Sequence, residues 1–379
     1  LMGLAKNIIH ARFGKLTVAT DQDQTSGLYL LTHTDKQRAN EWNPVSGLGF
    51  TEEGIPYLSR PLALSCYSTV YSEIRDIDLL DEMYKRQKKI DKISRADFDK
   101  QRHYRHINSL PESDCTDPDG NPCYTGRAIF SHLFSVVGAD NISATFKGNT
   151  PMVDEDGSIL RENGKKVPET VIVRDSQLIQ GTLEKDAFGE GGSSLAPSFI
   201  YHFGYEKGQE ILSEYIELVT RLGFAGHRVI GYTMGSDDVS AKKFKTEEDE
   251  EGKEVFVLDE NGNRIDEIAE EIDTKYAIAA AKIEDIQKRW NDKDLASVAY
   301  DDRQKQISAE LDPVSFLEEE IFAISDKYES DILVPIEDAQ GSGNPMQIAV
   351  RSRARGKDIN VRQMAGSYGM VLVGGKRIR

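Results

Sequence analysis

The last thirty residues hold the strongest candidate for chemistry in this sequence. Eight of them are Arg or Lys and none is Glu, in a chain of 379 residues whose formal net charge is -17. Within this run Arg355 precedes Gly356 and a helix that we expect from Asp358 to about Met370. A guanidinium at a tight glycine turn beside a helix start combines a fixed charge with free backbone N–H groups, which suits a phosphate. The residues alone leave open the alternative that Arg355 pairs with a carboxylate in its loop.

Other reactive side chains show weaker patterns. Cys115 and Cys123 flank the turn CTDPDGNPC, where they could be metal ligands or a redox pair, but they lack the CxxC spacing of a zinc site. There is no GxSxG, Walker loop or HExxH, and only His103 and His106 lie close together among the histidines. We therefore expect no complete catalytic constellation within the chain.

Short turns rich in acidic or amide side chains occur in VDEDGSIL, RENGKKV and VFVLDENGNRI. Each places Asp-Gly or Asn-Gly between short candidate strands, which predicts β-hairpins. An EF-hand loop needs glycine at its sixth position and glutamate at its twelfth. Counting from Asp154 and Asp259, however, Gly157 and Gly262 are fourth. We predict that these turns do not bind calcium.

Composition limits the class of protein. With 39% hydrophobic and 29% charged residues, the chain is typical of a globular protein. No apolar run approaches the roughly 20 residues that span a bilayer, and no signal peptide is evident, so we expect a cytoplasmic protein without a membrane partner. The negative charge argues against a surface devoted wholly to nucleic acid, but it leaves room for a local basic patch.

Helical periodicity is clearest in the second half of the chain. A helix is predicted from Gly208, and we expect Gly223 to end it. Two further helices, near 264–291 and 312–329, should form an antiparallel hairpin, the second with Asp312 as N-cap and Pro313 at its first position. The expected apolar seams comprise Ile268, Ile272, Tyr276, Ala279, Ile283, Ile286 and Trp290 on one helix, and Val314, Leu317, Ile321, Ile324 and Tyr328 on the other.

The first hundred residues are less regular. After Lys15 we expect a strand, a polar turn and then a short strand or helix, with Gln22 and Asp23 fixing the turn by side-chain-to-backbone hydrogen bonds. Residues 80–108 are highly charged, and we predict a helix there with a solvated face rather than a phosphate-binding one.

Five stretches, in order along the chain, resemble motifs of the largest subunit of multisubunit RNA polymerases, with wording closest to the archaeal and eukaryotic forms. The segment that follows the family's magnesium-binding NADFDGD motif is similar to LMGLAKNIIHARFGKLTVATDQDQTSGLYLLT. In the second stretch, YTGRAIFSHLF resembles the family's W-T-G-K-Q-I-F-S. In the third, VIVRDSQLIQGTLEKDAFG resembles V-I-x-x-G-x-L-I-x-G-x-x-D-K-x-x-G. In the fourth, RLGFAGHRVIGYTMGSDDV resembles L-x-x-G-F-T-x-G-I-x-D. In the fifth, the basic run that closes the chain resembles S-G-A-R-G-S-x-x-N-x-x-Q-M.

The resemblance implies an α+β fold in three parts. A pore-like domain with short strands and hairpins is expected over 1–200. A funnel-like helical-hairpin domain, with a β-hairpin insertion near 254–265, is expected over 201–345. Residues 346–379 would begin the cleft region that leads towards the bridge helix. Both ends would then be the boundaries of an internal fragment.

The same resemblance implies DNA-directed RNA synthesis by nucleotidyl transfer. This segment would shape the secondary channel and help nucleotides to enter and take position. The family's Mg²⁺ would be held by aspartates expected before Leu1, so we expect this chain to bind none. The implied partners are the other polymerase subunits, especially the second-largest, with template DNA, RNA and nucleoside triphosphates. The alternative is a non-enzymatic protein whose helical hairpin docks partners, which leaves the ordered motifs unexplained.

The resemblance also assigns the site residues. Arg355 matches the Arg or Lys that approaches the incoming triphosphate, and Asn360 and Gln363 match positions that hold the following helix or face the substrate. This sequence departs from the motif at two nearby positions, with Arg353 in place of Gly and Lys357 in place of Ser, and these two extra cations should attract phosphate. It also carries Met-Val at 370–371, where the family has Gln-Gln.

Overall fold

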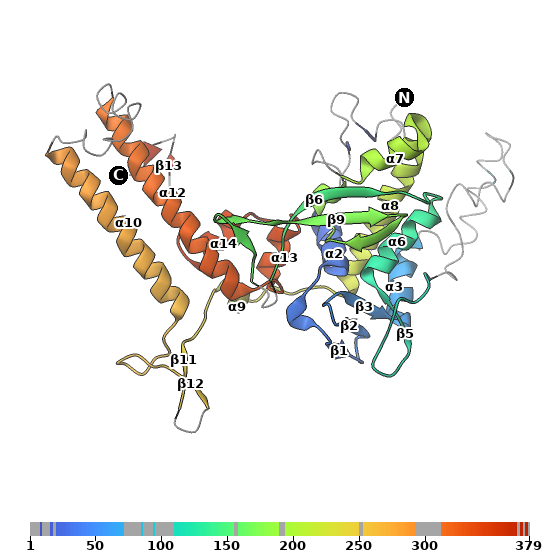
Figure 1. Ribbon diagram of the computed structural model, residues 1–379, viewed down its shortest axis with the longest axis horizontal. Helices are drawn as coiled ribbons and strands as arrows, with labels where there is room; N and C mark the ends of the chain where they lie inside the picture. Colours follow the sequence, from blue (N-terminus) through green and yellow to red (C-terminus); the bar gives the residue numbers. More distant parts are fainter. Residues whose placement is uncertain are drawn as a thin grey trace. The chain divides into compact units, whose positions relative to one another are not determined.

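The computed structural model describes residues 8–9, 16–17, 20–71, 85, 94, 110–154, 158–188, 194–249, 253–292, 312–369, 372–373 and 376–377. Its internal contacts divide the chain into two compact units, whose elements are labelled in Figure 1. The first comprises Leu1–Thr233 and Ile348–Arg355, and the second Met234–Gln347 and Gly356–Arg379. These contact units do not follow the boundaries at 200/201 and 345/346 that we expect for family domains, which stay predictions.

Short antiparallel strands and helices alternate through the first unit, which confirms the α+β class. One sheet has the strand order β1-β2-β3-β5-β4 and another has β10-β9-β6. The elements are α2 (Gln22–Thr32), η1 (Lys36–Arg38), β1 (Trp42–Asn43), β2 (Leu48–Phe50), β3 (Pro56–Ser59), α3 (Arg60–Tyr71), β4 (Cys115–Thr116), β5 (Pro122–Thr125), α6 (Gly126–Val136), β6 (Ala144–Pro151), β7 (Arg161–Glu162), β8 (Lys165–Lys166), β9 (Pro168–Arg174), β10 (Gln177–Gln180), η2 (Lys185–Phe188), α7 (Ala196–Phe203) and α8 (Tyr205–Val229).

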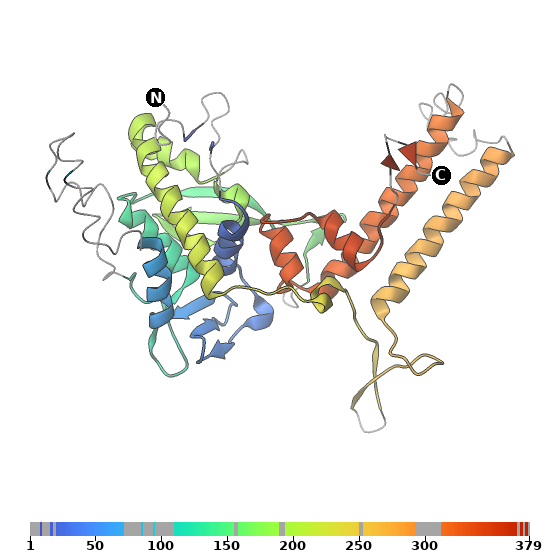
Figure 2. The same ribbon diagram turned by 180° about the vertical axis from the view of Figure 1, so that it is seen from behind.

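Helix α8 is the centre of the first unit. It contacts α2, α3, α6 and α7, and Figure 2 shows its length from behind. Its predicted apolar stripe is buried, and Tyr215 lies among Phe130, Phe134 and Phe199 with ring centroids 4.5–6.0 Å apart. Aromatic rings at such distances attract one another beyond their area burial. This cluster therefore fixes three helices against one another.

The prediction that Gly223 ends α8 is wrong, because the helix continues to Val229. Gly223 faces Gly27 at the point where α8 crosses α2. A Cβ on Gly223 would lie 2.2 Å from the carbonyl oxygen of Gln24, and one on Gly27 would lie 1.8 Å from that of Gly223. The two glycines therefore serve close backbone approach between helices rather than helix termination.

The turn expected at Gln22 and Asp23 is also wrong, since both residues lie in the first turn of α2. The helix start is closed instead by Asp21, whose N–H donates to Oε1 of Gln24 at 3.2 Å. Gln22 has a φ of +46°, which is unusual for a residue with a side chain. The preference of Asp for turns was outweighed by the burial of the apolar residues that follow it.

The predicted hairpin turns are confirmed where the structure describes them. Strands β7 and β8 pair across Asn163 and Gly164, whose φ values of +51° and +76° fit a type I′ turn. In VFVLDENGNRI the Asp259 carboxylate accepts hydrogen bonds from the N–H groups of Asn261 and Asn263, each at 2.8 Å. This carboxylate is therefore used to hold its own loop. Gly157, in the remaining turn, lies outside the described residues.

The second unit is mainly helical. Its elements are α9 (Ser236–Val239), β11 (Thr246–Glu248), β12 (Glu254–Phe256), α10 (Glu267–Asn291), α12 (Pro313–Gln340), α14 (Asp358–Ala365), β13 (Leu372–Val373) and β14 (Lys376–Arg377), while α13 (Pro345–Arg351) ends in the first unit. Strands β11 and β12 pair antiparallel, and Leu258 pairs with Arg264 just beyond them. The chain thus forms a short hairpin around Asn261, as its turn predicts, while the funnel-like domain expected to contain it stays a prediction.

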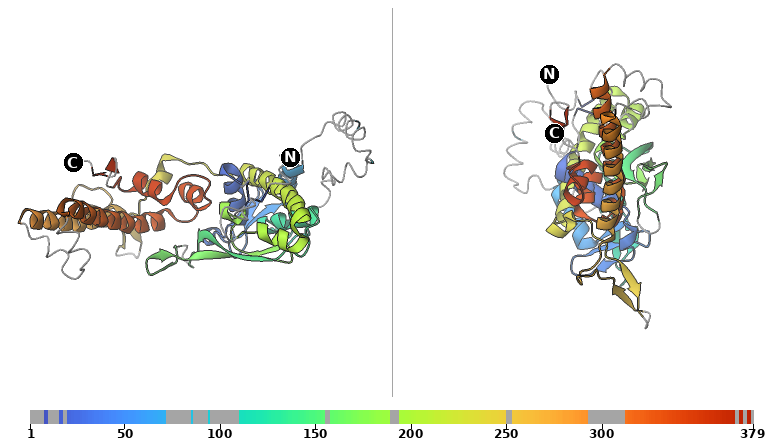
Figure 3. Two further views of the ribbon diagram at one scale, coloured as in Figure 1. Left: turned by 90° about the horizontal axis from the view of Figure 1, so that it is seen from above. Right: turned by 90° about the vertical axis from the view of Figure 1, so that its left-hand side faces the viewer.

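Helices α10 and α12 form the predicted antiparallel hairpin (Figures 1 and 3). Ile286 packs with Leu317 and Ile321, whereas the earlier Ala279 packs with the later Tyr328 and Ile332. The Asp312 carboxylate caps α12 by accepting from the N–H of Ser315. The seams are confirmed except at two expected members that are at least half exposed, Tyr276 (61%) and Val314 (50%).

Helix α12 runs past the expected end at residue 329, although it contains Pro335. Proline has no N–H and leaves the carbonyl four residues earlier without its helical partner. Here that carbonyl belongs to Asp331, and it accepts a hydrogen bond from Nζ of Lys275 on α10 at 2.8 Å. The neighbouring helix thus satisfies the group that proline frees.

Two expectations fall wholly or largely outside the described residues, namely the charged segment 80–108 and the Met-Val pair at 370–371. In the part of the chain that the structure does describe, no helix is both long and apolar enough to cross a membrane.

Candidate nucleotide-binding turn

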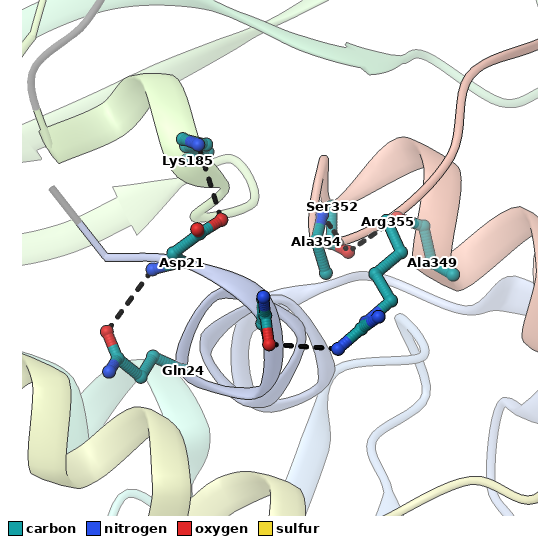
Figure 4. Close-up of polar contacts among 8 residues, drawn as sticks. Asp21, Gln24, Lys185, Ala349, Ser352, Ala354 and Arg355 are labelled. Carbon is teal, nitrogen blue, oxygen red and sulfur yellow. Dashed lines mark hydrogen bonds and ion pairs between the residues drawn. The ribbon is translucent and has the colours of Figure 1, made fainter.

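The site is built on the arginine turn (residues 352–355), which follows α13 in the first unit. The N–H of Ser352 donates to the carbonyl of Ile348, and that of Arg355 donates to the carbonyl of Ala349, both at 3.0 Å. The Ser352 hydroxyl donates to Ala349 O and accepts from the N–H of Ala354, each at 3.3 Å (Figure 4). The turn is therefore held by its own backbone and one buried serine.

Arg353 occupies the position where the family motif has glycine, and its φ of +59° explains that preference. A left-handed conformation costs a non-glycine residue about 1 kcal/mol. The Arg353 guanidinium forms an ion pair with Asp186 of η2, and the N–H of Lys185 donates to the carbonyl of Ser352 at 3.4 Å. The turn is thus fastened to η2 at two adjacent residues.

Arg355 projects in a different direction and is exposed. Its Nη2 donates to Oε1 of Gln22, the first residue of α2, at 2.9 Å. Figure 4 shows this arginine together with Asp21, which pairs with Nζ of Lys185 at 3.3 Å. Among the described residues, the Arg355 side chain therefore pairs with a neutral amide and not with the carboxylate of the alternative interpretation.

Asn360 and Gln363 lie on α14, in the second unit. Oδ1 of Asn360 accepts from the N–H of Lys357 at 2.9 Å, so this side chain stabilises the start of α14. Gln363 is half-buried nearly one turn further along. Asn360 thus lies in the first turn of the helix and Gln363 near its end, because the helix stops at Ala365 rather than at about Met370.

A buried ion pair on α14 had no sequence signal. Arg362, between the two predicted residues, pairs with Glu329 of α12, and both side chains are nearly buried, with exposed fractions of 10% and 12%. Because the two residues are far apart in sequence, only packing brings them together. This pair fastens α14 to the helical hairpin.

A second polar cluster is buried inside the first unit. Tyr29 and His33 stack with centroids 4.6 Å apart, and Nδ1 of His33 lies 3.4 Å from Oγ1 of Thr182. Burial, with help from the positive charges of Arg351 and Arg127, lowers the pKa of His33 to about 3. His33 is therefore neutral near pH 7, where it supports the core rather than accepting protons.

Glu184 is a buried acid two residues before Asp186. Its Oε1 accepts from the N–H of Asn149 at 2.5 Å and from Nδ2 of Asn149 at 3.0 Å. Burial raises the pKa of Glu184, although the two bonds from Asn149 oppose the shift. Asn149 Nδ2 also donates to Asp186, so this amide links Glu184 to the carboxylate that pairs with Arg353.

The cysteine alternatives are not supported by the local chemistry. Cys115 and Cys123 lie opposite each other on β4 and β5, and both are free thiols. Burial raises the pKa of Cys123 and raises that of Cys115 to about 12, so neither thiol is activated as a nucleophile near pH 7. Among the described residues, no three His, Cys, Asp or Glu side chains are grouped as a metal site requires.

Comparison with known families decides where the chain belongs. The family model described as RNA polymerase Rpb1, domain 3, matches residues 7–239. The chain belongs to this family. A second model of the Rpb1 family, domain 4, matches residues 299–379, which include the arginine turn and α14. The resemblance noted in the sequence is thereby confirmed.

Curated relatives of this Rpb1-family chain are archaeal. The DNA-directed RNA polymerase subunit Rpo1N of two strains of Halobacterium salinarum is 24% identical over 378 residues, which is 100% of this chain and 27% of the relative. The subunit of the same name from Methanocaldococcus jannaschii is 22% identical over 262 residues, 69% of this chain and 16% of the relative. The chain thus spans about a quarter or less of the length of these relatives.

Proposed function

We propose that this Rpb1-family chain works within a DNA-directed RNA polymerase and that Arg355 binds the triphosphate of the incoming nucleotide. One observation carries the assignment of Arg355. Its guanidinium is exposed, projects from a turn with a fixed backbone, and has a neutral partner in Gln22. The family and the order of the motifs support the polymerase context.

The neutral partner matters for the energetics. A triphosphate that replaces the Gln22 amide exchanges one neutral hydrogen bond for charge-assisted bonds, and a guanidinium can donate two of these in parallel. Had Arg355 been paired with a carboxylate, the nucleotide would have had to displace an opposite charge. The turn therefore holds Arg355 in place without strong competition for its charge.

The reaction follows from the family context as part of the same proposal. Nucleotidyl transfer joins a 3′-hydroxyl to the incoming triphosphate, and Mg²⁺ would supply the alignment and charge neutralisation of the phosphates. Ligands for that metal would come from outside the described residues. This chain would contribute walls of the nucleotide-entry channel, with the second-largest subunit, template DNA and RNA as partners in the complete enzyme.

The test is steady-state nucleotide incorporation by a polymerase reconstituted with this chain. Arg355→Ala should reduce kcat/KM for the nucleotide roughly 30- to 1,000-fold, the usual cost of one well-placed charge contact. Arg355→Lys should recover part of the loss because the charge survives while the paired-donor geometry does not. Affinity for the template should stay nearly unchanged, since it depends on phosphate contacts spread over the enzyme.

Arg174 provides a matched control, because it is an exposed arginine at the end of β9 in the same unit. Arg174→Ala should leave kcat/KM within about twofold, as for most exposed surface substitutions. Normal incorporation by Arg355→Ala with a loss of DNA binding would mean that Arg355 contacts nucleic acid and that this proposal is wrong.

A further inference from the structure

Arg353 stands in the arginine turn where the family motif has glycine. Its φ of +59° lies in the left-handed region, which glycine adopts freely and arginine adopts only at a cost. Non-glycine residues in such conformations persist where surrounding interactions hold them. A specific interaction should therefore compensate for the conformation of Arg353.

That interaction is the ion pair with Asp186. The Asp186 side chain is only 16% exposed, and it also accepts a hydrogen bond from Nδ2 of Asn149. A carboxylate held in this way offers a fixed anchor, and its partial burial reduces screening by solvent. The adjacent backbone bond from Lys185 N–H to the Ser352 carbonyl holds the same two segments together.

The two arginines of the turn are therefore engaged differently. The charge of Arg353 is matched by a carboxylate of η2. The side chain of Arg355, two residues later, hydrogen-bonds to the neutral amide of Gln22. Within the part of the chain that the structure describes, Arg353 is thus paired with a carboxylate and Arg355 is not. This differs from the expectation that both extra cations near Arg355 attract phosphate.

We propose that Arg353 is a positioning residue, and that its ion pair with Asp186 holds the arginine turn in the conformation that presents Arg355. This inference rests on the proposed role of Arg355 as the triphosphate contact. Arg353 does not touch the nucleotide. It keeps Arg355 in place before the nucleotide arrives, so that less ordering is required on binding.

The experiment uses Arg353→Gly in the reconstituted polymerase. Glycine keeps the left-handed backbone without strain, so this substitution removes the ion pair and frees the backbone at that position. We expect KM for the nucleotide to rise roughly tenfold with kcat changed less, because misplacement of a binding group weakens ground-state contacts first. Asp186→Asn, which removes the same pair from the other side, should give a similar rise.

Two further variants separate positioning from general damage to the fold. The exchange Arg353→Asp with Asp186→Arg restores opposite charges and should recover most of the lost affinity. In an Arg355→Ala background, Arg353→Gly should raise KM by less than about twofold, since a positioning residue has no effect once the group that it positions is gone.

Each outcome bears on one claim. If Arg355→Ala has no effect on KM or kcat/KM, the proposed function is wrong whatever Arg353 does. If Arg355→Ala does impair the enzyme but Arg353→Gly leaves KM within about twofold of the parent, the positioning role is refuted. Equal effects of Arg353→Gly with and without Arg355 would also refute it, as would failure of the exchanged pair to recover affinity.

Discussion

The crossing of α2 and α8 at Gly27 and Gly223 gives the sharpest stability prediction. In Gly27→Ala, the new Cβ would lie 1.8 Å from the Gly223 carbonyl oxygen and 2.6 Å from the backbone N of His227. Ordinary contact begins at 3.4 Å, so the closest pair must separate by 3.4 − 1.8 = 1.6 Å. Both obstructing atoms belong to helix backbone, so no side-chain rotation can relieve the clash.

The size of the effect follows from what surrounds this crossing. Separation of the helices would open the contacts of Leu28 and Leu31, which are fully buried in the main core. Overpacking of a core costs about 1–3 kcal/mol, and a backbone-to-backbone clash belongs at the upper end. We expect a loss of about 3 kcal/mol, or roughly 6–12 °C in Tm for a unit of this size.

The assay is thermal and urea unfolding of the 379-residue chain, followed by far-UV circular dichroism. Gly148→Ala is the control, because its Cβ would meet Glu184 Oε1 and Val171 Cγ2 at 3.6 Å and the Glu169 carbonyl oxygen at 3.7 Å, all in ordinary contact. It should change stability by less than about 0.5 kcal/mol. If Gly27→Ala were as stable as this control, the close crossing would not exist and the placement of Gln22 by α2 would lose its basis.

Three further predictions concern other parts of the chain. Ile286→Asp should destabilise the helical hairpin by at least about 3 kcal/mol, because it buries a charge in the seam. Ile278→Asp on the same helix, at a side chain 52% exposed, should be nearly neutral in the same melting experiment. His33 should make stability depend on pH. Its pKa is about 3 when folded against 6.5 in the unfolded chain, so the unfolded state binds the extra proton, and the free energy of unfolding should fall from pH 6.5 towards pH 3 by on the order of 4 kcal/mol. His33→Gln should lack this part of the pH dependence, and equal slopes for the two proteins would contradict the burial of a neutral histidine. The turn at Asp259 should not bind calcium, and calorimetry that found a site tighter than about 10 μM would show otherwise.

Local chemistry was sufficient for the elements that depend on neighbours in sequence. The cap at Asp312, the turn at Asn163 and Gly164, and most of the hairpin seams were predicted correctly because each signal lies within a few residues. The same logic failed at Gly223. A glycine after an apolar helical stripe usually marks a helix end, and nothing local reveals that another helix crosses there.

The sequence by itself determined the family, the α+β class and Arg355 as a candidate triphosphate contact, because motif residues and their order are written along the chain. The tertiary structure decided what those residues touch. Asp186 reaches Arg353, Gln22 reaches Arg355 and Glu329 reaches Arg362 only after folding. No periodicity or spacing encodes pairs so far apart in sequence, since they form where packed helices and turns bring side chains together. The left-handed backbone of Arg353 could likewise not be predicted from its residue type. Arginine rarely adopts this conformation unless an interaction formed on folding compensates for it.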